Sequence, residues 1–452
     1  MLLTAIVAAA VMLAAQLRAP GYSLQYRDIY GIEARRWMST PILISFSTSL
    51  SAPPPNIKAG SDVMGAARRA LRHWAAAGDI QFVELSSSAQ TMSPTNVGDG
   101  VNLITVSASN AAVFGSSESP GRTRVFYDIG GSVVEADIAL NPNEPFSSDG
   151  TAGTYDLEST FTHEIGHLIG LDHSAVIGAT MQPRQPMNGL YNLPAFTQRT
   201  LSDDDYAAAR SLYGPRKGIG SISGKLMTST SGRAETIFGG HVFAEDVATG
   251  KVVAGSITLV NGDYHLDGLP PGEYLVIGQS LNGPVAAGDI ASSAGSYFGL
   301  TETTPAFRSS VGMGLNLLQS IKVGASTATD LSFFVFSNPP PSLKPEVIGM
   351  NDELSTAALP VQPGKTFTIY VGGPGVDQVS ADGISLSSPL MNVNSGTLRA
   401  EEFAVSYPVI SFDVTVASNV QPGDYSIRLR SQSGELAYLA GAITIEREMN
   451  PR

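Results

Sequence analysis

The pattern of apolar and polar positions changes along the chain. Between residues 36 and 214, runs that alternate apolar and polar residues stand beside runs whose apolar residues recur every three or four positions. Alternation is typical of half-buried strands, and the longer spacing is typical of amphipathic helices. From residue 218 the helical spacing stops, and short β-prone runs alternate with turn residues. We therefore expect an α+β region followed by all-β regions.

The α+β region is expected to contain a twisted sheet and three helices. The alternating segment 41–50, rich in β-branched residues, predicts the first strand. A helix follows it, capped by Ser61 or Asp62 and closed by Gly78. The remaining predicted elements are strands at 80–85, 101–107, 123–131 and 133–141, a helix beginning after Asp156, and a helix at 201–214.

The all-β part divides at a proline-rich segment. Residues 337–345 read SNPPPSLKP, which is typical of a stiff linker. We expect one β-sandwich at 218–336 and a second at 346–447.

The N-terminus carries an unbroken apolar run from Met1 to Ala15. The run is short for a membrane span and has the length of the apolar part of a signal peptide. We expect residues 1–19 to be a signal peptide and the protein to be secreted, in the extracellular space or with the bacterial envelope. Because no Lys or Arg precedes Arg18, the usual basic start is missing, and an uncleaved anchor remains the alternative.

Composition narrows the chemistry. The net charge of −13 argues against a nucleic-acid partner, which requires a basic face. The chain has no cysteine, so it has no disulfide and no thiolate ligand. Any transition metal must be held by histidines and carboxylates.

Residues 162–174, THEIGHLIGLDHS, contain three of the six histidines. On a helix, His163 and His167 are four positions apart and project from one face. Gly170 is expected to end the helix with a positive φ, and the turn can bring His173 back to the other two. Three imidazoles with an open fourth position are the ligand set of a catalytic zinc.

Glu164 stands beside the first of these histidines. It is expected to accept a proton from zinc-bound water during attack on a carbonyl. A polar patch on an ordinary helix and a structural zinc are the alternatives. Structural sites close with a fourth protein ligand, and this segment supplies none.

This stretch resembles the HExxHxxGxxH signature of the metzincin metallopeptidases, and Ser174 after the third histidine resembles their matrixin branch. The downstream GATMQPR resembles the matrixin Met-turn. The resemblance covers about residues 36–214. It implies a metzincin-type fold, a zinc endopeptidase activity, Met181 as an apolar floor beneath the zinc, and Pro183 along a wall of the substrate pocket.

The chain departs from animal matrixins. It lacks the cysteine of their propeptide switch, and their second zinc site is missing because only His73 remains nearby. His73 is expected to be structural. Structural Ca²⁺ at Asp128 or Asp137 is a further hypothesis.

Other polar residues receive simpler interpretations. The run Asp203–Asp205 is expected to serve the dipole of its helix, and resemblance to matrixins suggests that one of the three tethers the mature N-terminal segment. Asp172 is expected to face solvent, and His241 and His265 are expected to be ordinary surface or core residues.

The two β-sandwiches carry weaker resemblances. Residues 218–285, with NGDYHLDGLPPGEYLVIG, resemble carboxypeptidase-regulatory-like modules, and 346–447 resemble Ig-like or IPT modules. They are expected to act as spacers, or to dock surface or polymeric ligands.

Together these features predict a secreted zinc endopeptidase that acts on proteins or peptides and has no membrane span in its mature chain. The alternatives are a surface adhesion protein with a vestigial metal domain and an enzyme that hydrolyses non-protein amides.

Overall fold

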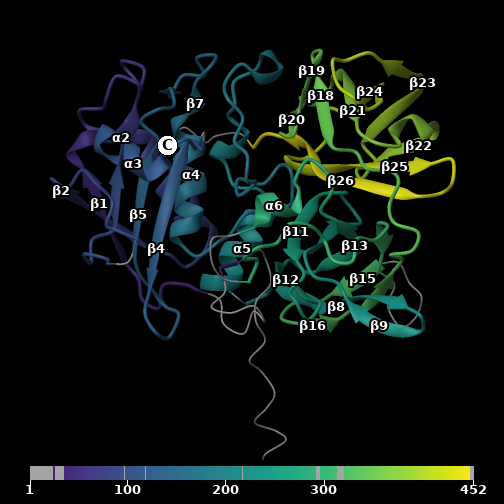
Figure 1. The fold of residues 1–452 in the computed structure, drawn as a ribbon, viewed down its shortest axis with the longest axis horizontal. Coiled ribbons are helices and arrows are strands. Elements are labelled where there is room, and N and C mark those ends of the chain that lie inside the picture. Colours follow the sequence, from purple (N-terminus) through teal and green to yellow (C-terminus); the bar gives the residue numbers. More distant parts are fainter. Residues whose placement is uncertain are drawn as a thin grey trace, which may run out of the picture.

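The sheets of the protein fall into three groups along the chain. We call these the N-terminal region (37–214), the middle region (218–336) and the C-terminal region (346–447), which lie at the left, lower right and upper right of Figure 1. The expected signal peptide, residues 1–19, lies outside the described residues. The computed structural model describes residues 24–25, 35–95, 97–117, 119–215, 217–291, 296–312 and 320–447.

The N-terminal region is built on a five-stranded sheet in the order β2-β1-β3-β5-β4. Four strands are parallel, and β4 runs antiparallel to β5 at one edge. All the predicted strands of this region are confirmed. The strands are β1 (Ile42–Ser47), β2 (Phe82–Ser87), β3 (Leu103–Thr105), β4 (Gly121–Tyr127), β5 (Val133–Leu140), and the separate pair β6 (Phe146–Ser147) and β7 (Tyr155–Asp156).

The three predicted helices of this region are also confirmed. Asp62 caps the first helix by accepting from the backbone N–H of Gly65 at 2.9 Å, and Gly78 follows its last turn. Trp74 is fully buried and donates its indole N–H to the carbonyl of Thr162 at 2.7 Å, which joins the first helix to the second. The helices are α2 (Val63–Ala77), α4 (Leu157–Leu168) and α5 (Asp203–Tyr213), with a short α3 (Ala111–Phe114) and 3₁₀ turns at Thr48–Leu50, Ala108–Asn110, Leu190–Asn192 and Thr197–Arg199.

The described residues of the middle region form two five-stranded sheets and one short helix. One sheet has the order β11-β10-β13-β14 with β15 beside β13, and the other has β12-β8-β16 with β9 and β17 beside β8. The one-turn helix α6 (Ala287–Ile290) is a departure from the all-β expectation. The strands are β8 (Gly220–Thr230), β9 (Arg233–Thr236), β10 (Gly240–Asp246), β11 (Val252–Ile257), β12 (Asp263–Leu269), β13 (Gly272–Ser280), β14 (Ser310–Val311), β15 (Ser320–Val323), β16 (Ala328–Asp330) and β17 (Phe333–Val335).

The C-terminal region also has two sheets, in the orders β19-β18-β21-β24-β23 and β20-β26-β25-β22. Its core includes Phe412, Ile427 and Leu439, all 1 % exposed or less. The strands are β18 (Val347–Met350), β19 (Glu353–Ser355), β20 (Leu359–Pro360), β21 (Thr366–Gly372), β22 (Val379–Leu386), β23 (Met391–Glu401), β24 (Val409–Val416), β25 (Gly423–Ser431) and β26 (Leu436–Ile445), with a 3₁₀ turn at Val376–Gln378.

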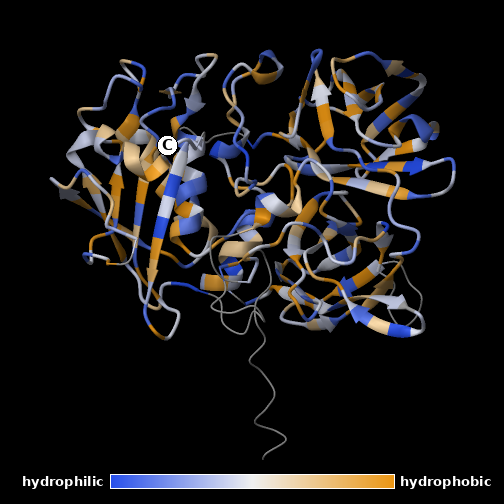
Figure 2. Cartoon of the chain, in the orientation of Figure 1, coloured by the Kyte–Doolittle hydropathy of each residue, from blue (hydrophilic) through white to orange (hydrophobic). Residues whose placement is uncertain are grey.

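Apolar positions alternate with polar ones along many of the strands, as Figure 2 shows. Within the part of the chain that the structure describes, no helix has the length and apolar character needed to cross a membrane.

The three regions pack against one another around the start of α5. The carboxylate of Asp203 lies 3.2 Å from the ammonium of Lys251 in the middle region and 2.6 Å from the guanidinium of Arg447 in the C-terminal segment. Arg428 and Glu245 form an ion pair between the other two regions. Figure 1 shows α5 and α6 at the centre of the molecule, between the regions. Both β-sandwiches are therefore in contact with the N-terminal region and with each other.

Candidate metal centre and active site

The helix α4 places two of the candidate ligands. It begins after Asp156, whose carboxylate accepts from the backbone N–H of Ser159 at 2.9 Å, as the sequence predicted. Its apolar residues on one face are buried in the core, while the rings of His163 and His167 lie with their centroids 4.8 Å apart. The four-residue spacing therefore brings both imidazoles to one place.

The turn after α4 brings the third histidine to the other two. Gly170 has a φ of 102°, and a Cβ at this position would lie 2.2 Å from the carbonyl oxygen of Arg35. Only glycine fits this turn without a rearrangement. The ring of His173 then lies 5.4 Å from that of His163 and 4.9 Å from that of His167, measured between centroids.

In each imidazole, Nδ1 forms a hydrogen bond with a backbone carbonyl and Nε2 is available to bind a metal. The Nδ1 atoms of His163, His167 and His173 lie 2.8, 2.9 and 3.0 Å from the backbone carbonyls of Thr180, Leu171 and Asp289. A carbonyl can only accept, so each Nδ1 carries the proton, and the lone pair is on Nε2. One ring nitrogen from each histidine lies within 4.8 Å of the other two.

The electrostatics of the cluster favour neutral rings. Burial first, and then the neighbouring imidazole, lower the pKa of each of the three histidines to about 3. Neutral imidazole is the form that binds a metal. Three neutral nitrogen donors face one another, and the described residues add no fourth protein ligand to the cluster, so the arrangement fits a zinc ion with an open position.

Glu164 lies beside this cluster and is 4 % exposed. Burial raises the pKa of its carboxyl to about 7, and the hydroxyl of Thr123, which donates to Oε2 at 2.5 Å, opposes the rise. A Cβ on Gly121 would lie 2.5 Å from Oε1, so the backbone of β4 passes directly over the carboxylate. A carboxyl with a pKa near neutrality can both take up and release a proton.

The cluster opens into a cavity of about 200 Å³. Residues 119–123, on and before the edge strand β4, form one wall. The three histidines and Glu164 lie in the cavity, and Pro183 and Gln185 also line it. Pro183, for which the matrixin resemblance implied a place along a substrate pocket, lines this cavity.

Met181 lies beneath α4. It is 2 % exposed, and a Cβ at Gly166 of α4 would lie 2.2 Å from its sulfur, so the sulfur packs directly against the helix backbone. Its turn is held by Asp205, whose carboxylate accepts from the backbone N–H groups of Thr180 at 2.8 Å and Met181 at 3.3 Å.

The simple interpretation of the run Asp203–Asp205 was therefore incomplete. Asp205 does cap α5, because it forms a capping box with Ser202. Asp204 is 4 % exposed and accepts from the Ser174 hydroxyl at 2.7 Å and from the backbone N–H of Gly255, in the middle region, at 2.6 Å. A helix cap uses one carboxylate, so the run of three in the sequence could have indicated that Asp203 and Asp204 have other partners.

The expectation for Asp172 was wrong. It does not face solvent, because it is 9 % exposed and accepts from the backbone N–H of His173 at 2.9 Å. Burial raises the pKa of its carboxyl to about 7, while the charge of Arg35 opposes this rise.

The remaining polar candidates have structural partners. His73 lies 3.1 Å from the carboxylate of Glu158 in α4. Asp137 accepts from two backbone N–H groups, and Asp128 closes the turn between β4 and β5 by accepting from Ser132. Neither aspartate belongs to a cluster that could hold a metal, among the residues described. His241 is fully buried in the middle region, as one of the two expected placements had it.

The sequence did not indicate three residues of the site. Thr123 and Gly121 lie on a strand whose position beside Glu164 depends on the sheet order. Asp289 reaches His173 from 116 positions away, and no local spacing marks such a contact.

Comparison with known proteins points to one family for the N-terminal region. Residues 37–214 match the model of the matrixin family. Metalloendoproteinase 1 of Glycine max is 35 % identical over 82 residues, which are 18 % of this chain and 22 % of the relative. Metalloendoproteinase 4-MMP of Arabidopsis thaliana is 27 % identical over 202 residues, 43 % of this chain and 53 % of the relative. The alignments thus span about half or less of these relatives.

Solved structures that match are distant. A putative carbohydrate binding protein from Bacteroides uniformis is 14 % identical, with 52 % of this chain and 95 % of that chain covered and a TM-score of 0.16. The major pilin subunit BcpA of Bacillus cereus is 12 % identical, with 49 % and 66 % covered and a TM-score of 0.14. Scores this low carry no argument about this protein. The matching family model covers the region that holds the three histidines, so residues 37–214 are similar to the matrixin family.

Proposed function

We propose that the protein is a zinc-dependent endopeptidase whose active site is the His163, His167 and His173 cluster with Glu164. The observation that carries the proposal is the arrangement of three imidazoles, one buried and two partly buried, whose Nε2 atoms are free and face one another beside the carboxyl of Glu164. The match of the surrounding residues to the matrixin family supports it.

The residues divide the work as follows. His163, His167 and His173 would hold the zinc ion, which when bound supplies the Lewis acidity that polarises a carbonyl and makes water nucleophilic near neutral pH. Glu164 takes the proton of the attacking water and can pass it to the leaving amine. The hydroxyl of Thr123 holds Oε2 of this carboxylate, which leaves Oε1 to accept the proton.

The wall of the cavity favours an extended peptide as the substrate. β4 is an edge strand, and the residues at its start border the cavity. A strand edge offers backbone N–H and C=O groups to which an extended chain can add. A peptide added to β4 would lie close to Glu164, because the backbone of Gly121 in that strand already lies beside its carboxylate.

The test is cleavage of a denatured protein by the purified full chain, together with its metal content. Wild type should contain one zinc and lose activity with a chelator. Glu164→Ala should keep the zinc and lose about 10²–10⁴-fold in kcat/KM, the range for removal of a general acid–base group. Glu402→Ala, which removes an exposed glutamate of the C-terminal region, is the control and should behave as wild type.

Two results would contradict the proposal. Cleavage that survives complete removal of metal would exclude the zinc mechanism. A zinc-loaded wild type that cleaves no protein or peptide would favour a binding protein with a vestigial metal domain, or action on another amide.

We also propose that the protein is secreted, from the apolar run at residues 1–15. N-terminal sequencing of protein recovered from the medium or the cell envelope should show a chain that begins near residue 20. An uncleaved chain in the membrane fraction would support the anchor instead.

A further inference from the structure

The helix α6 belongs to the middle region but lies against the metal site. The backbone carbonyl of Asp289 lies 3.0 Å from Nδ1 of His173. The side chain of the same residue accepts from the guanidinium of Arg184 at 2.8 Å. Arg184 directly follows Pro183, which lines the cavity. One residue of the middle region thus contacts a candidate metal ligand and the wall next to it.

The three candidate ligands differ in what holds them. The Nδ1 atoms of His163 and His167 donate to Thr180 and Leu171, which belong to the same region as the histidines themselves. His173 has its Nδ1 partner in a different region, 116 positions away. The partner of the second nitrogen sets the tautomer and the orientation of a ligating histidine.

The carbonyl of Asp289 is presented by a well-anchored turn. Ala287 and Ile290 are 1 % exposed or less, so they fix α6 in the core of the middle region. The second carboxylate oxygen of Asp289 accepts from the backbone N–H of Ala286 at 2.9 Å and closes the turn. The carboxylate therefore serves both the shape of α6 and the contact with Arg184.

A second contact holds the residue that follows the ligand. The hydroxyl of Ser174 donates to Asp204 at 2.7 Å, and the other oxygen of Asp204 accepts from the backbone N–H of Gly255 in β11 at 2.6 Å. Asp204 thus ties the His173–Ser174 segment to the middle region from a different direction. The two contacts together restrict both the ring and the backbone of this segment.

We infer that the middle region positions the third metal ligand, with the Asp289 carbonyl as the group that orients His173. The inference rests on the proposed zinc site. It makes the first β-sandwich a working part of the metal centre, where the sequence suggested a spacer or a docking module. Asp289 acts here through His173 and is a positioning residue.

The experiment measures metal binding directly on the full chain. The first variant replaces Ala287–Ile290 with Gly-Ser-Gly-Ser, which removes the anchors and the closed turn. The second is Asp289→Ala, which loses the turn closure and the Arg184 contact but keeps a backbone carbonyl. Asp289→Asn keeps an oxygen that can accept from Ala286, and Glu302→Ala removes an exposed glutamate of the same region as the control.

The zinc dissociation constant, measured by competition with a chromophoric chelator, should rise about 10–100-fold in the α6 replacement, as for other partners of metal-bound histidines. Asp289→Ala should show a smaller rise, and Asp289→Asn and Glu302→Ala should stay near wild type. The visible spectrum of the cobalt-substituted protein should change in the same order, because it reports the geometry of the ligands. A merely structural role of α6 would leave that spectrum unchanged.

Thermal unfolding of the metal-free variants separates misfolding from loss of the ligand contact. A folded α6 replacement that binds zinc and cobalt as wild type does would overturn the inference. If that variant does not unfold cooperatively, Asp289→Ala decides, and an unchanged dissociation constant there would overturn it as well. Failure of wild type itself to bind zinc would instead contradict the proposed function.

Discussion

The two β-sandwich regions contact the N-terminal region at different points. The middle region contacts the candidate ligand His173 and also Arg184 through α6. The C-terminal region contacts Tyr191, in the loop that follows the Met-turn, through the connection between β18 and β19. By our inference the first contact orients a candidate metal ligand, and the second holds a loop that follows the cavity-lining residues Pro183 and Gln185. We therefore expect the middle region to control metal binding and the C-terminal region to control substrate binding.

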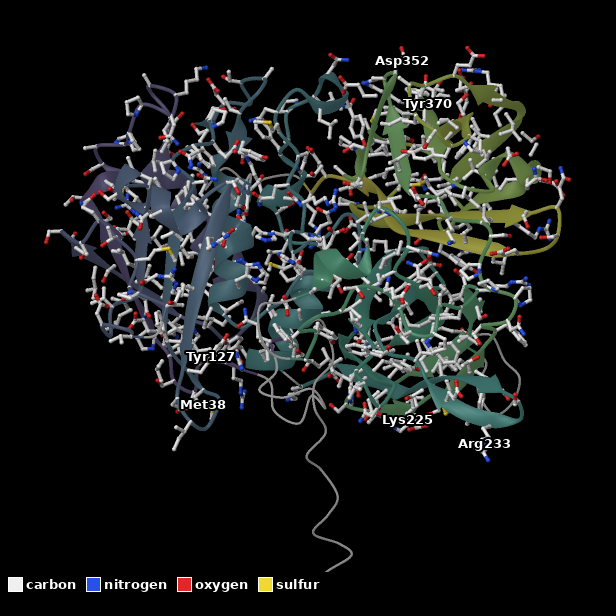
Figure 3. All side chains as sticks on the ribbon, in the orientation of Figure 1. Met38, Tyr127, Lys225, Arg233, Asp352 and Tyr370 are labelled. Atoms are coloured by element: carbon white, nitrogen blue, oxygen red, sulfur yellow. The ribbon has the colours of Figure 1, made fainter. Side chains whose placement is uncertain are left out.

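The contact from the C-terminal region is made by a tight hairpin. Asp352 has a φ of 62°, and the hydroxyl of Tyr370 donates to its carboxylate at 2.6 Å, a pair that Figure 3 labels. The neighbouring Asn351 donates to the carbonyl of Tyr191 at 2.6 Å, and Glu353 accepts from the backbone N–H of Tyr191. The hairpin thus forms hydrogen bonds with both the backbone N–H and the backbone carbonyl of Tyr191.

Among the variants that test this difference between the two regions, Tyr191→Ala is expected to have the largest effect on stability and on KM. The ring of Tyr191 is 1 % exposed, and its hydroxyl donates to the carbonyl of Ala357 at 3.1 Å. Loss of a buried aromatic side chain should lower the free energy of unfolding by about 3–5 kcal/mol. The loop should loosen, so KM for peptides should rise while the zinc dissociation constant stays unchanged.

Denaturant unfolding, steady-state kinetics and chelator competition check this prediction. Tyr191→Phe is the matched control, because it keeps the ring and removes one hydrogen bond, at a cost of about 1 kcal/mol. A large fall in zinc affinity in Tyr191→Ala would show that the two regions do not act separately.

Asp204→Ala is expected to lower stability by less and to reverse the pattern, so that zinc affinity changes and KM does not. This change removes the link between Ser174 and Gly255 and leaves a buried backbone N–H without a partner. The free energy of unfolding should fall by about 2 kcal/mol. The zinc dissociation constant should rise several-fold while KM changes little, because the segment next to His173 is freed.

The same assays compare this variant with Asp204→Asn, whose amide can still accept one of the two bonds. Equal zinc affinities in wild type and Asp204→Ala would show that the Asp204 contact with the middle region does not influence zinc binding. A rise in KM alone would assign Asp204 to the substrate wall.

The secondary-structure elements and the clustering of the three histidines could be predicted because their signals are local. The capping side chains Asp62 and Asp156 lie within three residues of the N–H groups that they bind. The spacing of His163, His167 and Gly170 places the ligands by helix geometry alone. Matches of this kind need no knowledge of the tertiary fold.

What the sequence could not indicate are contacts between regions. Asp172 was expected to face solvent, but tertiary packing covers it. Asp204 accepts a hydrogen bond from Gly255, which is 51 positions away, and Asp289 accepts one from His173, which is 116 positions away. A single sequence carries no periodicity that would mark such pairs, so the modules looked like spacers.

The smallest effect is a pH dependence of stability at the contact of the C-terminal region. Asp424 in β25 is 3 % exposed and packs against Gly178 of the N-terminal region, where a Cβ would lie 2.1 Å from its carboxylate. Burial raises the pKa of Asp424 to about 8, the nearby Asp203 adds to the rise, and the bond from Thr444 opposes it.

The folded state therefore holds a proton that the unfolded chain has released above a pH of about 4. The stabilisation is complete below the unfolded pKa and is lost as the pH rises through about 8. The melting temperature of the metal-free protein should fall between pH 5 and 8 in wild type, and less steeply in Asp424→Asn, which stays neutral and can still accept from Thr444. Metal-free protein is required because zinc binding itself depends on pH.

Asp382→Asn, which changes an exposed carboxylate of the same region, should keep the wild-type slope. If Asp424→Asn keeps that slope as well, the titrating group belongs to another contact, and the C-terminal region holds its place without a pH-sensitive carboxyl.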